Sequence, residues 1–90
     1  MWNREKERAN IRDHGLSFSD ATEAFADPHR ILAKDEKHSQ TEERLFCIGL
    51  VKGKAATVRF TSRGKTVRII GAGYWRQGRK LYEKTPSPRH

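Results

Sequence analysis

A chain of 90 residues has room for one domain and buries only about 60 to 68% of its unfolded surface, so a second lobe is excluded. Apolar residues make up 34% of the chain and charged residues 33%, and the mean hydropathy is −0.91, which predicts a small core under a charged surface. No apolar run approaches the about 18 residues that span a membrane, and the first residues lack a signal peptide's apolar segment. We therefore expect a soluble, cytoplasmic protein without a membrane partner.

Charge is distributed unevenly along the sequence. Residues 1–45 carry eight Lys/Arg against ten Asp/Glu, whereas residues 46–90 carry eleven Lys/Arg against a single acid, Glu83. A cationic surplus confined to one half can gather on one face and attract a polyanion. Nucleic acid is therefore the leading partner class, and the alternative is a basic surface that serves only solubility.

Two helices are expected near the N-terminus. Good helix formers fill residues 3–13, with Asn3 as an N-cap and Gly15 suited to the left-handed position after the last turn. A second helix is expected to begin near Ser17 or Ser19 and to stop before Pro28. Its apolar side chains, spaced as on one helical face, are Phe18, Ala21 and Phe25.

The rest of the chain predicts a sheet followed by one more helix. Residues 31–33 are apolar and residues 34–43 are polar and loop-like, after which strands are expected at 44–51, 55–61 and 66–72. The two turns are Lys52-Gly53 and Arg63-Gly64. A helix over 74–84 precedes a flexible tail, 85–90. The predicted class is α+β, with two N-terminal helices, an antiparallel sheet of three to four strands and a C-terminal helix in one domain, 1–84.

The hairpin pattern suggests a pair of opposed arginines. If Arg63-Gly64 is a two-residue loop, Arg59 lies opposite Arg68, and the alternate pairs Val58–Ile69 and Phe60–Val67 face the core. Two facing guanidinium groups repel, so an anion such as a phosphate between them would be favourable. The alternative is that both side chains extend into water, where their charges are screened. The same face would carry Phe46, Ile48 and Ile70, and the final helix laid across them would turn it into a groove.

Aromatic and basic residues alternate in the C-terminal part, a combination suited to unpaired RNA because bases stack on rings while cations hold phosphates. Trp75 is equally consistent with a core anchor, whereas Tyr82 is flanked by charge and is the better functional ring. The expected RNA-binding residues are Arg63, Lys65, Trp75, Arg79 and Lys80.

The remaining chemistry-bearing residues predict neither a metal site nor a bound cofactor. The four histidines form no i, i+4 pair, and no phosphate-binding glycine loop occurs. The one cysteine, Cys47, lies in an apolar run and is expected to be buried rather than reactive.

The chain resembles the BrnT family over nearly its whole length. The residues that carry the resemblance are Trp2-Asn3, Lys6, Asn10, His14-Gly15, Phe18, Asp35, His38-Ser39, Glu42, Arg44, Arg68-Ile69-Ile70 and Tyr82-Glu83. The resemblance implies a RelE-like fold and an endoribonuclease toxin of a type II toxin-antitoxin module, which cleaves RNA, inhibits translation and arrests growth. It also implies a BrnA-like antitoxin partner that binds operator DNA, and an mRNA substrate that could be ribosome-associated.

Two departures from the family pattern bear on activity. Asp13 stands where the family usually has lysine, and Gly73 stands where it usually has arginine, a charge that Arg76 could replace one helical turn later. His14, beside Gly15 at a helix end, suits a structural cap better than a catalytic base. The alternative to an active toxin is therefore a degenerate homologue that binds nucleic acid or antitoxin without cleaving.

The expected mechanism is metal-independent attack of the ribose 2′-hydroxyl on the neighbouring phosphorus. The catalytic candidates are Arg59, Arg68, Arg76 and Tyr82, the arginines stabilising charge on the phosphate. Tyr82 or Lys65 could carry protons.

Overall fold

A computed structural model describes residues 1–38 and 42–84, so the predicted tail at 85–90 lies outside the described residues. The elements, in chain order, are α1 (Arg4–His14), α2 (Phe18–Ala21), α3 (Glu23–Ala26), β1 (Ile31–Lys34), the 3-10 turn η1 (Glu36–His38), β2 (Arg44–Val51), β3 (Lys54–Arg63), β4 (Thr66–Gly73) and α4 (Arg76–Lys84). This is the predicted α+β class. The apolar stretch at 31–33 belongs to β1, which adds one strand to the three that the sequence placed explicitly. Within the described part of the chain, every helix is too short or too polar to span a bilayer.

Helix α1 begins and ends as its sequence predicts. The Asn3 side chain accepts hydrogen bonds from the backbone N–H groups of Glu5 and Lys6 at 2.8 and 3.1 Å. At the other end Gly15 takes the left-handed conformation, with φ +68°, and donates its N–H to the carbonyl of Ile11.

The second predicted helix forms as two short pieces, α2 and α3, that meet at Thr22. Ser17 caps the first piece by accepting from the N–H of Asp20 at 3.0 Å. The Thr22 hydroxyl donates to the carbonyl of Ser19 at 2.6 Å, a local bond that competes with a regular helix. Asp27 ends α3 with an extended backbone, as expected of a residue before Pro28.

The four strands form an antiparallel sheet in the order β1-β2-β3-β4. The turn at Lys52-Gly53 has positive φ at both residues, +54° and +80°, as a two-residue hairpin loop with matching twist requires. It sets the predicted register between β2 and β3, in which Leu45 pairs with Phe60 and Cys47 pairs with Val58.

The predicted register between β3 and β4 is wrong. Arg63 pairs with Thr66, so the loop residues are Gly64-Lys65 rather than Arg63-Gly64, because Gly64, with φ +56°, occupies the first loop position. The pairing shifts again between Arg59 and Phe60, where β4 has an extra residue. Three predicted pairs therefore do not form: Val58–Ile69, Phe60–Val67 and Arg59–Arg68.

Both arginines nevertheless share one face of the sheet. Arg68 pairs with Thr61, and Arg59 pairs with Gly71 on one side and Phe46 on the other. Thr61 and Arg59 are two residues apart on β3, and side chains two apart point to the same face. The arginines are thus diagonal neighbours rather than opposed partners.

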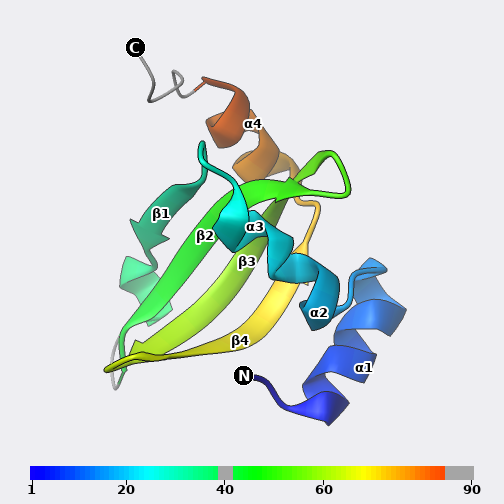
Figure 1. The fold of residues 1–90 in the computed structure, drawn as a ribbon, viewed down its shortest axis with the longest axis vertical. Helices are drawn as coiled ribbons and strands as arrows, with labels where there is room; N and C mark the ends of the chain where they lie inside the picture. Colours follow the sequence, from blue (N-terminus) through cyan, green and yellow to red (C-terminus); the bar gives the residue numbers. More distant parts are fainter. Residues whose placement is uncertain (39–41, 85–90) are drawn as a thin grey trace.

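Helices α2 and α3 lie over one face of the sheet, α1 lies beside its β4 edge, and α4 lies on the opposite face (Figure 1). The core fills the space between the sheet and helices α2 and α3; its residues include Leu16, Phe18, Ala21, Ala24, Cys47, Val51, Ala56, Val58, Phe60, Ile69 and Ala72. Helix α3 lies close to β2, since a Cβ on Gly49 would come 2.5 Å from the carbonyl oxygen of Ala24. On the opposite face, α4 packs against β3 through Gly78, whose missing side chain leaves room for Thr57.

Candidate functional site

The sheet face opposite the core is partly covered by α4, and a groove of about 710 Å³ opens beside that helix. Its floor comes from alternate residues of two strands, Phe46 and Ile48 on β2 and Thr57 and Arg59 on β3. Trp75, Gln77, Gly78 and Leu81 form the wall on the α4 side, and residues 34–37 form the opposite rim. The sequence-based expectation that the last helix would make a groove over this face is confirmed for Phe46 and Ile48, whereas Ile70 and Arg68 line a separate cavity.

Arg59 is half-buried and lies between two neighbours of very different size. Phe46 lies directly across from it on β2, and Gly71 lies across from it on β4. A Cβ on Gly71 would lie 3.9 Å from Cδ of Arg59, an ordinary van der Waals distance, so the arginine stem runs beside the glycine. The strand pairings thus place Arg59 on this sheet face, where it lines the groove.

Arg68 lines a second cavity of about 370 Å³ at the other end of the same face. The cationic side chains around this cavity are Lys6, Arg44, Arg63 and Arg68, and Thr61 and Thr66 add hydroxyl groups. Arg63 is partly neutralised, because its guanidinium donates to the carboxylate of Glu42 at 3.1 Å. We call this second site the cationic cavity; its charge suits an anion better than an apolar ligand.

Trp75 joins the groove to the first helix. The ring of His14 meets the ring of Trp75 edge to face, with centroids 5.2 Å apart. Gly73 lies next to the Trp75 ring, and a Cβ at position 73 would lie 2.6 Å from Cε2 of Trp75. The Trp75 ring therefore occupies the space that any larger residue at position 73 would need.

Tyr82 lies in neither cavity, and its hydroxyl has another partner. It donates to Oδ2 of Asp27 at 2.6 Å, and burial together with this bond raises the pKa of Tyr82 to about 12. Asp27 also accepts from the N–H groups of His29 and Leu50. Burial alone would raise the pKa of Asp27, but these hydrogen bonds outweigh it and hold that pKa below its ordinary value.

The other predicted site residues are spread over the exposed surface. Arg76, Arg79 and Lys80 are exposed on α4, and Lys65 is exposed in the β3–β4 loop. The structure therefore brings Arg59 together with Trp75 in the groove, and Arg68 with Arg63 in the cationic cavity, while Arg76, Arg79, Lys80, Lys65 and Tyr82 line neither.

Sequence reasoning did not assign a site role to several residues that line the cavities, among them Arg44, Thr61 and Lys6. Arg44 and Thr61 could have been found, because they pair with each other and alternate onto the face of Arg59. Lys6 could not, since only the packing of α1 beside β4 brings it to the cationic cavity.

Cys47 is fully buried, as predicted, and burial raises the pKa of its thiol to about 11, which opposes formation of a reactive thiolate. Within residues 1–38 and 42–84, no three His, Cys, Asp or Glu side chains gather closely enough to hold a metal ion.

Comparison with known proteins identifies one family for this chain. The model of one family, described as "Ribonuclease toxin, BrnT, of type II toxin-antitoxin system", matches residues 2–78. None of the curated proteins compared with the chain matches it. The match covers helices α1 to α3, the whole sheet and the start of α4. The chain belongs to the BrnT family of ribonuclease toxins of type II toxin-antitoxin systems.

Proposed function

We propose that this chain is an active endoribonuclease that cleaves RNA on the sheet face opposite its core. The observation that carries the proposal is the placement of Arg59, which is half-buried between Phe46 and Gly71 at the groove, with Arg68 diagonal to it on the same face. A guanidinium group held in this way can make two parallel hydrogen bonds to a phosphate.

The proposed reaction is an internal transfer within the RNA. The 2′-oxygen of one ribose bonds to the adjacent phosphorus, the bond from phosphorus to the next 5′-oxygen breaks, and a 2′,3′-cyclic phosphate and a 5′-hydroxyl result. One proton leaves the 2′-hydroxyl and one is delivered to the 5′-oxygen, so the atoms balance without water, a protein nucleophile or a metal ion. The protein orients the two oxygens and stabilises the extra negative charge on the phosphate.

The roles of the proposed residues follow from their positions. Arg59 and Arg68 stabilise charge on the phosphates, and Arg63, Arg76, Arg79 and Lys80 extend the attraction for the RNA backbone. Lys65, next to the cationic cavity, is retained as the candidate proton carrier. Tyr82 is reassigned to anchoring α4, because its hydroxyl is held by Asp27 and its pKa of about 12 keeps it protonated.

Incubation of the purified protein with end-labelled RNA in the presence of EDTA tests the proposal. We expect cleavage with cyclic-phosphate ends, and we expect Arg59→Ala or Arg68→Ala to reduce the rate about 10²- to 10³-fold, the usual effect of removing one group that stabilises transition-state charge. Arg68→Ala should also abolish growth arrest while leaving the fold and antitoxin binding intact.

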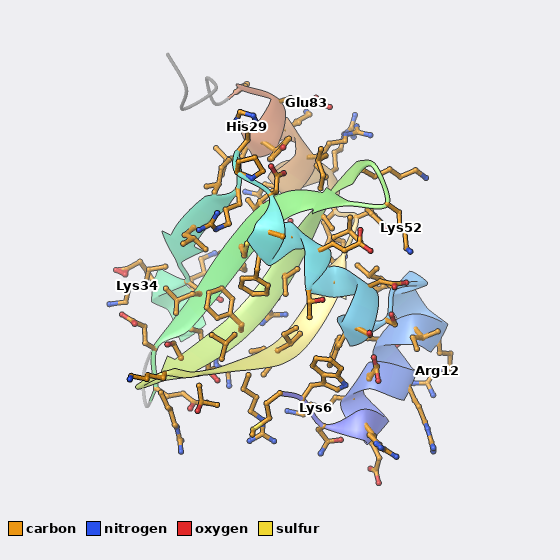
Figure 2. All side chains as sticks on the ribbon, in the orientation of Figure 1. Lys6, Arg12, His29, Lys34, Lys52 and Glu83 are labelled. Carbon is orange, nitrogen blue, oxygen red and sulfur yellow. The ribbon has the colours of Figure 1, made fainter. Side chains whose placement is uncertain are left out.

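Arg12→Ala is the matched control for net charge. Arg12 is exposed on α1, where it pairs with Asp13, and it lies on the opposite side of the molecule from Lys34 at the groove rim (Figure 2). The Arg12→Ala variant should cleave RNA at the same rate as the unmodified protein. Full activity of both Arg59→Ala and Arg68→Ala would contradict the proposed site.

One observation favours a second function, that of a binding module without cleavage. Gly73 replaces the arginine that the family resemblance leads us to expect, and Trp75 fills the adjacent space. Tight RNA binding with no cleavage product from the unmodified protein would support this alternative.

The proposed partners follow from family membership and charge. We propose that the toxin acts on mRNA in the cytoplasm, free or ribosome-associated, and thereby inhibits translation. A BrnA-like antitoxin that binds operator DNA would neutralise it by covering the cationic face with an acidic or apolar segment.

A further inference from the structure

The groove beside α4 combines a wide apolar surface with a small number of polar groups. Phe46, Ile48, Trp75 and Leu81 provide apolar and aromatic surface, and the volume of about 710 Å³ lies within the range of small-molecule sites. Such a lining favours a flat, partly apolar ligand over a bare anion.

A ring and a cation lie side by side on the groove floor. Phe46 and Arg59 are directly paired across β2 and β3, which places their Cβ atoms about 4.5 to 5.5 Å apart. Within one nucleotide the base and its phosphate are separated by a single sugar. One nucleotide can therefore stack its base on Phe46 while its phosphate contacts Arg59.

The groove also offers a hydrogen-bonding side chain. The hydroxyl of Thr57 is not that group, because it lies buried against Gly78 of α4. Gln77, on the α4 wall, supplies an amide that can both donate and accept.

The cationic charge next to the groove comes from its floor and from the neighbouring cavity. The rim itself is balanced, since Lys34 and Lys37 flank the acids Asp35 and Glu36, but Arg59 lies on the floor and the cationic cavity continues along the same face. Lys34 is only loosely paired with Glu36, at 3.8 Å and with both side chains exposed, so its charge stays available to a ligand.

We propose that this groove binds one unpaired nucleobase of the RNA, stacked on Phe46, next to the phosphate held by Arg59. The inference rests on the proposed function and makes it more specific. A base in a Watson–Crick duplex is stacked and paired, so it cannot enter the groove. The substrate class is therefore single-stranded RNA or an unpaired loop.

The test uses RNA that carries 2-aminopurine at one position and 2′-O-methyl groups at every ribose, so that it can bind but cannot be cleaved. Stacking quenches 2-aminopurine fluorescence, and we expect quenching on binding to the unmodified protein. Phe46→Leu keeps apolar volume but removes the ring; it should lose the quenching and weaken binding about 5- to 150-fold, the range for loss of one stacked base. Phe46→Tyr should retain both.

Leu32→Ala is the matched control, since Leu32 is a large, 57% exposed side chain on β1 outside the groove. Quenching that persists in Phe46→Leu, or equal losses in Phe46→Leu and Leu32→Ala, would overturn the inference. Equal binding of duplex and single-stranded probes would overturn it as well, and so would antitoxin binding that depends on Phe46 while RNA binding does not.

Failure of this inference can be distinguished from failure of the proposed function. If Phe46→Leu cleaves unmodified RNA as fast as the unmodified protein does, the ribonuclease proposal is supported and the base site is contradicted. If the unmodified protein quenches the probe but cleaves no RNA, the base site is supported and the ribonuclease proposal is contradicted.

Discussion

Asn10 is polar but buried, and its side chain fixes the last strand against the first helix. Its amide N–H group donates to the carbonyls of Leu16 and Ala72 at 2.8 and 2.7 Å, and its oxygen accepts from the N–H of Ala72 at 3.1 Å. Since Ala72 lies just beyond the irregular pairing in β4, this contact helps to set the path of the strand next to Arg59.

Asn10→Ala should therefore lower the free energy of unfolding by about 2 to 4 kcal/mol, because it leaves buried backbone groups of Leu16 and Ala72 without partners. Urea denaturation provides the measurement. The control is Ile11→Ala at the next, 47% exposed position, for which we expect a change within about 0.5 kcal/mol. Similar losses in both variants would mean that the hydrogen bonds are not the cause.

Gly73 and Trp75 depend on each other because their side-chain positions overlap. Gly73→Ala should destabilise the protein by about 1 to 3 kcal/mol, the usual cost of overpacking. In a Trp75→Ala background the same substitution should cost little, so a double-mutant cycle measured by urea denaturation should show a coupling of similar size. Additive losses would contradict the steric explanation, which also accounts for the absence of a larger residue at position 73.

The sequence predicted single residues well where the cause is local. The capping by Asn3 and Gly15 and the burial of Cys47 follow from neighbours within a few positions, and all are confirmed. The opposition of Arg59 and Arg68 failed first because Gly64-Lys65, rather than Arg63-Gly64, forms the loop. It failed further because β4 has an extra residue near Ala72, which contacts Asn10 across 62 residues of the chain. Alternation along a strand carries no information about such a contact.

Among the elements, α4 depends most on a few specific contacts. It packs on β3 through Gly78 and is held at its other end by the hydrogen bond from Tyr82 to Asp27. The sequence predicted the helix but assigned Tyr82 to the active site, since a charged flank does not reveal that a partner lies 55 residues away. The position of α4 matters for function because the helix forms one wall of the groove.

Tyr82→Phe should lower the free energy of unfolding by about 1.5 to 3 kcal/mol near neutral pH, because the lost hydrogen bond has a charged acceptor. The folded pKa of Asp27 lies below its ordinary value of 3.8, so the stabilisation is present above that pH and is lost as the pH falls through the folded pKa. Removing the Tyr82 hydroxyl brings the folded pKa of Asp27 closer to its ordinary value. The difference between the two proteins should therefore shrink on acidification, as measured by urea denaturation from about pH 7 to about pH 3.

Tyr74→Phe is the matched control for this pH dependence. The Tyr74 hydroxyl donates to the carbonyl of Val51 at 3.2 Å, a neutral acceptor. Its loss should cost about 0.5 to 1.5 kcal/mol, with no change over the same acidic range. A pH-independent difference for Tyr82→Phe would show that Asp27 is not the group responsible.

In the whole molecule, several acids make hydrogen bonds between elements, whereas most cations of the second half are exposed. Glu7 accepts from the N–H groups of Phe18 and Ser19 and so joins α1 to α2, and Asp27 holds β2 and α4. Many acids of the first half therefore serve the fold. The excess cations of the second half lie on β3, β4 and α4, and the sequence predicted this imbalance from charge counts alone.

If these cations hold RNA phosphates, binding should weaken as salt rises, with a log–log slope of about −0.7 for each phosphate contacted on a single strand. Removing one contact by Arg68→Ala should make the slope shallower by about 0.7, whereas Arg12→Ala, with the same change in net charge, should leave it unchanged. Fluorescence anisotropy of a labelled 2′-O-methyl RNA over a salt series measures both slopes. Equal effects of the two variants would mean that overall charge, rather than the arrangement of cations on the sheet, attracts the RNA, because only a localised contact depends on which arginine is removed.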